Sequence, residues 1–96
     1  MSKITIFASM TVDDQHADKV RDAVLELIPP TLAEAGCLEY RFHQSNDRPG
    51  QFFFYENWAS MDALREHRQT EHLKRYLNKV NGLIAGQDSQ VVTELS

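Results

Sequence analysis

Two histidines, His67 and His72, stand five residues apart in the second half of the chain. A neutral imidazole can take a proton from a phenolic hydroxyl near pH 7, so either residue could act as a general base. Two metal ligands on one helix need a spacing of three or four residues, which these two do not have. No acidic residue completes a convincing ligand set, so we predict no metal site. In the alternative role, both rings fasten helix ends through hydrogen bonds to the backbone.

Aromatic residues crowd the segment 51–58, QFFFYENW, and could line a cavity for a flat aromatic ligand. Tyr55 and Trp58 each carry a polar tip that needs a partner when buried, so they are candidates to orient a substrate oxygen. Phe53 and Phe7 could form apolar walls of the same cavity. Core and dimer packing is the better explanation for these two phenylalanines.

Two other residues could complete such a cavity. Tyr76, on a later helix, could close it. Glu56, which stands among the aromatic residues, could face it as a carboxylate or bond to a helix cap or to an arginine across a dimer. Cys37 is the only cysteine, and a free cysteine without a clear histidine partner usually packs as a small apolar residue.

The elements that must position these residues follow from the apolar pattern. Alternation and β-branched or aromatic content predict strands at 3–11, 37–44, 51–58 and 90–95. Helical spacing predicts helices from Asp13 to Gly36, from Ser60 to about Arg68, and from Thr70 to Gly86.

Prolines and glycines refine the first predicted helix. Pro29 and Pro30 remove backbone donors, which predicts a kink or a restart at that point. Gly36 could end the helix, because glycine readily takes the left-handed conformation found after many helices.

The order β–α–β–β–α(α)–β predicts an α+β fold of the ferredoxin-like, split βαβ type, with an antiparallel sheet and helices on one face. The strand 51–58 has bulky side chains on both faces. A sheet with one face in water would instead show apolar and polar residues in strict alternation along its strands. We therefore expect the second face to be covered by the sheet of another subunit in a homodimer.

Length and charge narrow the function. The 96 residues suffice for a single domain spanning 1–96, and a core of this size benefits from burial against a second copy. A net charge of −4 without a basic patch argues against nucleic acid or an anionic membrane as a partner. The chain has no apolar run of roughly 20 residues and no signal-peptide pattern at its start, so we predict a cytoplasmic protein.

Residues 34–76 resemble the antibiotic biosynthesis monooxygenase (ABM) family. The resemblance rests on EAGCLEYRFHQ, on a turn containing Pro49, and on FFFYENWASMDALREHRQTEHLKRY, in this order and spacing. It implies a ferredoxin-like domain whose sheets pair into a dimeric α+β barrel, with His67 and His72 around the pocket. Known members oxygenate quinols and polyketide phenols without a cofactor, process a small signalling sugar, or break down haem.

The leading hypothesis is a cofactor-independent monooxygenase that oxidises a small phenol or hydroquinone with O2. The chain contains no glycine-rich phosphate loop, so the sequence shows no motif that would bind the phosphates of a nucleotide cofactor. His67 would be the base, while Tyr55, Trp58 and Tyr76 would orient the ring.

Three alternatives stay open. The haem-degrading branch relies on an asparagine in the first strand, a tryptophan and a histidine ligand, and this sequence matches none of them. A non-catalytic module that binds a small aromatic or signalling molecule is a second alternative. An isomerase of a small phosphosugar is a third, and it would need cationic groups in the pocket such as Arg41, Arg65 or Arg68.

Overall fold

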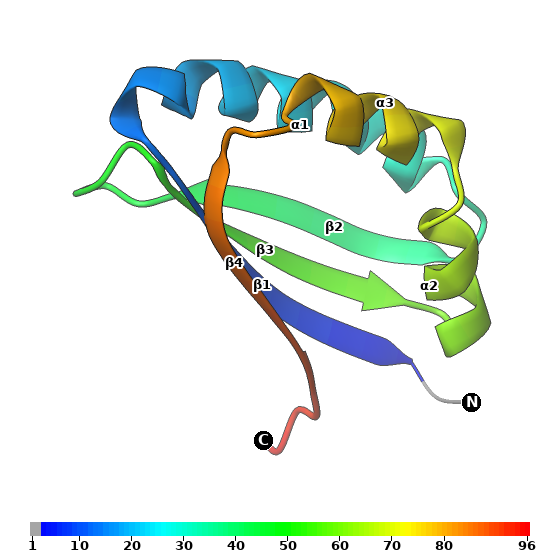
Figure 1. The fold of residues 1–96 in the computed structure, drawn as a ribbon. Coiled ribbons are helices and arrows are strands. Elements are labelled where there is room, and N and C mark those ends of the chain that lie inside the picture. Colours follow the sequence, from blue (N-terminus) through cyan, green and yellow to red (C-terminus); the bar gives the residue numbers. More distant parts are fainter. Residues whose placement is uncertain (1–2) are drawn as a thin grey trace.

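Four strands form one antiparallel sheet in the computed structural model, which describes residues 3–96 (Figure 1). The strands are β1 (Ile4–Val12), β2 (Cys37–Gln44), β3 (Gln51–Trp58) and β4 (Ile84–Val92). They run in the spatial order β2–β3–β1–β4, the ferredoxin-like arrangement that the element order predicts. β2 and β3 have the predicted bounds.

The helices all lie on one face of this sheet, as predicted (Figure 1). A short 3-10 turn, η1 (Asp14–His16), leads into α1 (Ala17–Leu32), and the later helices are α2 (Met61–His67) and α3 (Glu71–Lys79). α1 and α3 run side by side above the strands, whereas α2 sits at one end of the sheet. Within residues 3–96, no helix is both long enough and apolar enough to cross a membrane.

The core lies between the sheet and the helices and has two parts. One joins Met10 and Phe52 of the sheet to Val20 and Val24 of α1. The other gathers side chains around Trp58 at the α2 end of the sheet, namely Ile6, Tyr40 and Leu64. Burial of one such side chain contributes about 1.5–3 kcal/mol, so these clusters fix the helices over one face.

α1 runs without interruption through its two prolines, so the predicted restart at Pro29-Pro30 does not occur. The prolines lie in the last turns, where few backbone bonds remain to be lost. The two carbonyls that lose their donors belong to Leu25 and Glu26, which are on the exposed side where water can replace them. Thr31 adds a bond from its hydroxyl to the Leu27 carbonyl at 2.8 Å.

Gly36 serves close packing and not the left-handed stop that we expected. α1 ends at Leu32, and Gly82 is the position between residues 3 and 96 with a positive φ, 82°. A Cβ atom added to Gly36 would lie 2.3 Å from the Cβ of Ala63 in α2. The glycine therefore lets the loop after α1 approach α2.

The C-terminal elements differ from the prediction in their bounds. α3 ends at Lys79 and β4 begins at Ile84, although a helix to Gly86 and a strand at 90–95 were expected. The turn between them uses the left-handed Gly82. β4 is an edge strand whose side chains are mostly exposed, so it carries little of the apolar alternation by which a strand is found.

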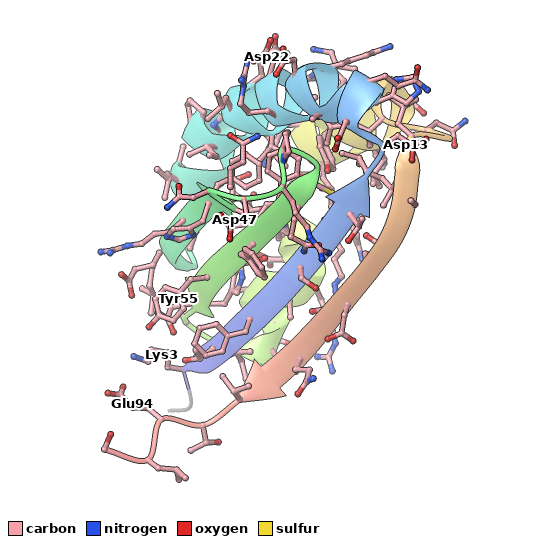
Figure 2. The ribbon with its side chains drawn as sticks, turned by 90° about the vertical axis from the view of Figure 1, so that its left-hand side faces the viewer. Lys3, Asp13, Asp22, Asp47, Tyr55 and Glu94 are labelled. Atoms are coloured by element: carbon pink, nitrogen blue, oxygen red, sulfur yellow. The ribbon has the colours of Figure 1, made fainter. Side chains whose placement is uncertain are left out.

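The other face of the sheet is open in the single chain (Figure 2). Phe7 is 54% exposed and Phe53 44% exposed, and the Phe7 ring lies 5.3 Å from that of Tyr55. Phe7 and Phe53 also line a hollow of about 280 Å³ on this face. The second apolar face that the sequence of β3 predicts is therefore present.

Candidate functional site

A cavity of about 270 Å³ opens between the sheet and helices α2 and α3. Apolar and polar side chains line it in nearly equal numbers. A pocket in which polar groups converge among apolar walls is the usual form of a small-molecule site. The apolar lining residues include Met10, Phe54, Leu64, Leu73 and Leu77, and the polar ones are Ser9, Tyr40, Glu56, His67, Arg68, Tyr76, Gln87 and Ser89.

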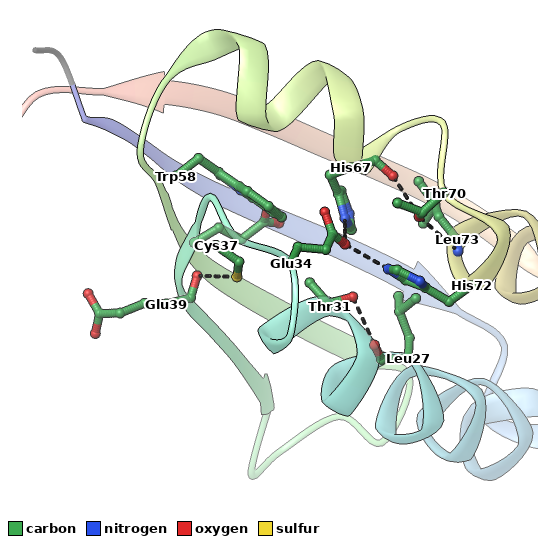
Figure 3. Close-up of polar contacts among 11 residues, drawn as sticks. Leu27, Thr31, Glu34, Cys37, Glu39, Trp58, His67, Thr70, His72 and Leu73 are labelled. Carbon is green, nitrogen blue, oxygen red and sulfur yellow. Dashed lines mark hydrogen bonds and ion pairs between the residues drawn. The ribbon is translucent and has the colours of Figure 1, made fainter.

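Glu34 joins His67, which lines this cavity, to His72, which does not (Figure 3). Glu34 Oε2 lies 2.8 Å from His67 Nδ1 and 2.6 Å from His72 Nε2. The side chains are little exposed, at 14% for Glu34, 6% for His67 and 16% for His72. We call these three residues the Glu34 cluster. An acidic partner for the histidines, which the sequence analysis did not find, is therefore present.

The junction between α2 and α3 brings the two histidines together. His67 ends α2, and Thr70 caps α3 with its hydroxyl accepting from the Leu73 amide. The same hydroxyl donates to the His67 carbonyl at 2.8 Å. The chain thus changes direction between the histidines, and their ring centroids lie 6.2 Å apart. The predicted break at Thr70 therefore explains why the two rings lie close together, although their spacing of five suits no single helix face.

His67 is held by packing as well as by Glu34. Its ring lies 4.6 Å from that of Trp58 and 5.8 Å from that of Tyr40. When the Glu34 carboxylate accepts from Nδ1–H, the neutral ring carries no proton on Nε2, the nitrogen left for the cavity. A carboxylate that fixes a histidine tautomer in this way prepares the ring to act as a base.

Glu56 brings a second carboxyl group to the cavity. Its Oε1 accepts from the indole N–H of Trp58 at 2.9 Å. Burial raises the pKa of Glu56, and the bond from Trp58 opposes this shift without cancelling it. Of the two roles left open for Glu56, facing the pocket is the one observed in the single chain.

Two tyrosines line the same cavity as hydroxyl donors. Burial raises the pKa of Tyr76 to about 12, and it raises the pKa of Tyr40 well above its ordinary value. Both phenols therefore keep their protons at neutral pH. The Tyr76 hydroxyl also donates to the Met10 sulfur at 3.5 Å.

Comparison with known proteins identifies the family. Residues 3–79 match the family described as "Antibiotic biosynthesis monooxygenase". The chain belongs to this family. The match covers the elements from β1 through α3, which include the Glu34 cluster and the cavity walls on β3 and α2.

Individual relatives of this ABM protein support the same family assignment. "Putative monooxygenase Rv0793" of Mycobacterium tuberculosis is 30% identical over 86% of this chain and 81% of its own length. Its solved structure has a TM-score of 0.88, covering 99% of this chain and 97% of that one. "Probable quinol monooxygenase YgiN" of Escherichia coli K12 is 29% identical over 70% of this chain and 72% of its own. An uncharacterized Synechocystis protein, sll1783, is 33% identical over 60% of this chain, which spans only 40% of that relative.

The aromatic residues of this ABM protein do not converge on one cavity. Along β3, Glu56 and Trp58 point to the helices, whereas Phe53 and Tyr55 point to the open face. The expectation that Tyr55, Phe53 and Phe7 line the pocket with His67 is therefore wrong, because side chains alternate between the faces of a strand. Trp58 is fully buried behind Glu56 and is absent from the cavity wall.

Two residues of the site were not identified from the sequence. Glu34 follows the end of α1 in a loop, and Tyr40 has the ordinary alternation of a strand. Of the three arginines named as candidate pocket cations, Arg68 lines the cavity, whereas Arg41 and Arg65 pair with Glu39 and Asp62 away from it. Only the E-A-G sequence before β2, part of the family resemblance, marks Glu34 in the sequence.

Proposed function

We propose that the protein is a cofactor-independent monooxygenase that oxidises a small phenol or hydroquinone with O2 in the cavity beside His67. The observation that carries this proposal is the Glu34–His67 bond at the wall of a partly apolar cavity. It supplies a positioned proton acceptor beside the space that a substrate would occupy. The cytoplasmic location stays a prediction.

Proton removal starts the proposed reaction. His67 Nε2 takes the hydroxyl proton of the substrate, and the electron-rich phenolate then reduces O2 directly. One oxygen atom enters the ring and the other leaves as water, so a phenol and O2 give a quinone and water with all four electrons coming from the substrate. The protein has to supply the base, the orientation and stabilisation of the anion.

The remaining polar groups suit the phenolate that forms. Tyr76 stays protonated and can donate to its oxygen, and the guanidinium of Arg68 adds positive charge at the cavity wall. Glu56 lies at the same wall, where its carboxyl group can hydrogen-bond to the substrate. The names of the two monooxygenase relatives, one of them "Probable quinol monooxygenase YgiN", support the same reaction class.

A homodimer through the open face of the sheet belongs to the same proposal. Phe7, Phe53 and Tyr55 form an apolar patch there that a single chain leaves in water. A second sheet would cover the patch and close an α+β barrel, the arrangement implied by the family resemblance. Stable interfaces bury about 800 Å² per partner, which one face of a four-stranded sheet can supply.

Oxygen uptake with menadiol tests the activity. Catalase and superoxide dismutase suppress background autoxidation, and the enzyme-dependent rate is measured for the wild type and for His67→Ala. We expect the variant to lose about 10²- to 10⁴-fold in kcat, the usual contribution of a general base.

His43→Ala is the matched control, because His43 is an exposed histidine on β2. This variant should keep the wild-type rate. A full enzyme-dependent rate in His67→Ala would remove His67 as the base. If the wild type accelerates the uptake of O2 by none of several phenols and quinols, the monooxygenase proposal fails and a binding module becomes the better description.

A further inference from the structure

We propose that Glu34, His67 and His72 form a binding site for one divalent transition-metal ion of the Zn²⁺ class. Their ligand atoms lie within 4.8 Å of one another, from three elements or loops that the fold brings together. Two imidazole nitrogens and one carboxylate oxygen are a common donor set for Zn²⁺ and for Fe²⁺. Mg²⁺ and Ca²⁺ prefer all-oxygen sites and should not compete.

Admitting an ion requires the three ligand atoms to be rearranged. Glu34 Oε2 now lies 2.6 Å from His72 Nε2 and 2.8 Å from His67 Nδ1, and all three ligand atoms lie within 4.8 Å of one another. Metal bonds of about 2.0–2.2 Å would set tetrahedral ligand atoms about 3.3 Å apart, so the carboxylate has to retreat by about half an ångström and the two ring nitrogens have to take up the same spacing. Glu34 lies beyond the end of α1 at Leu32, where no helical bond fixes its position.

The surroundings hold the two rings in place. Trp58 and Tyr40 pack against the His67 ring, and the Thr70 cap fixes the start of the helix that carries His72. Rigid ligands lower the entropic cost of capturing an ion. His72 also lines a hollow of about 60 Å³ between α1 and α3, which is large enough to admit water to its ring.

Binding would change the chemistry of His67. An ion on Nδ1 forces the ring proton onto Nε2, which then donates and no longer accepts. Zn²⁺ should therefore inhibit oxygen uptake with menadiol, an effect that rests on the proposed function. Metal binding itself does not depend on that function and can be measured without any substrate.

Visible absorption of bound Co²⁺ is the direct readout. The full chain, freed of metal with EDTA, is titrated with CoCl2 and then with ZnCl2 as the displacing ion. We expect a single site per chain with the d–d bands of a low-coordinate Co²⁺. Glu34→Gln and His72→Ala should each bind at least about 100-fold more weakly, since even the loss of an outer partner of a metal ligand costs 10–100-fold.

His43→Ala should bind Co²⁺ as the wild type does, and circular dichroism checks that all variants are folded. Two variants at different positions keep the test valid if one of them fails to fold. The proposal is overturned if the wild type gives no Co²⁺ bands, or if both variants bind as tightly as the wild type. In that case the Glu34 cluster is a hydrogen-bonded network only, and oxidation of menadiol would be unaffected by Zn²⁺.

Discussion

Glu56 shows, at the scale of one residue, that burying a carboxyl group at the candidate site lowers the free energy of unfolding. The folded chain buries this carboxyl group and raises its pKa above the ordinary value of 4.5. Between that value and the raised one, the folded state holds a proton that the unfolded state has released. The free energy of unfolding contributed by Glu56 therefore falls as the pH rises through this window, and the cost stays in full above it.

Glu56→Gln should thus make the folded protein more stable at pH 7 and leave its stability unchanged below pH 4.5. The amide oxygen can still accept from Trp58, so the variant removes the buried charge and keeps the bond. Urea unfolding of both proteins from pH 4 to pH 8 measures the difference. Glu66→Gln, at an exposed glutamate on α2, should match the wild type throughout. Equal midpoints of the Glu56 variant and the wild type at pH 7 would contradict the predicted cost of burial.

At the scale of elements, the loop after α1 and the start of α2 fit together because Gly36 has no side chain. Ala63 fills the space in which the Cβ atom of any other residue would lie. The backbone also joins there, since the Gly36 carbonyl accepts from the Ala59 amide at 2.8 Å. This contact places Glu34, two residues earlier, under the end of α2 where His67 is found.

Gly36→Ala should therefore destabilise the fold by about 1–3 kcal/mol, the usual cost of overpacking. Gly86→Ala on β4 is the matched control, because no atom lies within 4 Å of its added Cβ, and it should change the stability by less than about 0.5 kcal/mol. Chemical denaturation of the three proteins measures both effects. Equal stability of Gly36→Ala and the wild type would show that α2 can move away freely.

At the scale of the whole molecule, the sheet serves two purposes through its two faces. The helix face carries the cavity and the Glu34 cluster, while the open face carries Phe7, Phe53 and Tyr55. Alternation along β3 connects them, since Phe54 and Glu56 face the cavity between residues that face outward. A substitution on the open face should therefore alter the proposed dimer without altering the cavity on the helix face.

Phe53→Glu should convert the proposed dimer to a monomer, because it places a charge at the centre of the apolar patch. Sedimentation velocity measures the mass. Leu25→Glu is the control, since Leu25 is 50% exposed on α1, against 44% for Phe53 on the sheet. This control should stay dimeric, and a Phe53→Glu protein that remains a dimer would move the interface elsewhere.

The order of elements, the bounds of β2 and β3, and the caps Ser60 and Thr70 could be predicted from the sequence, because they depend on periodicity and on local hydrogen bonds. It also indicated His67 and the two apolar faces of β3. It misjudged Pro29-Pro30, since the tolerance of a proline depends on which carbonyls reach water.

The composition of the site depends on contacts between segments that are distant in the sequence. The bond between Glu34 and two histidines more than thirty residues away joins a loop to the ends of two helices, and no local spacing encodes it. The face on which Tyr55 lies is likewise fixed by which side of β3 the helices cover. Chemistry-bearing residue types are visible in a sequence, whereas their convergence depends on packing between distant segments.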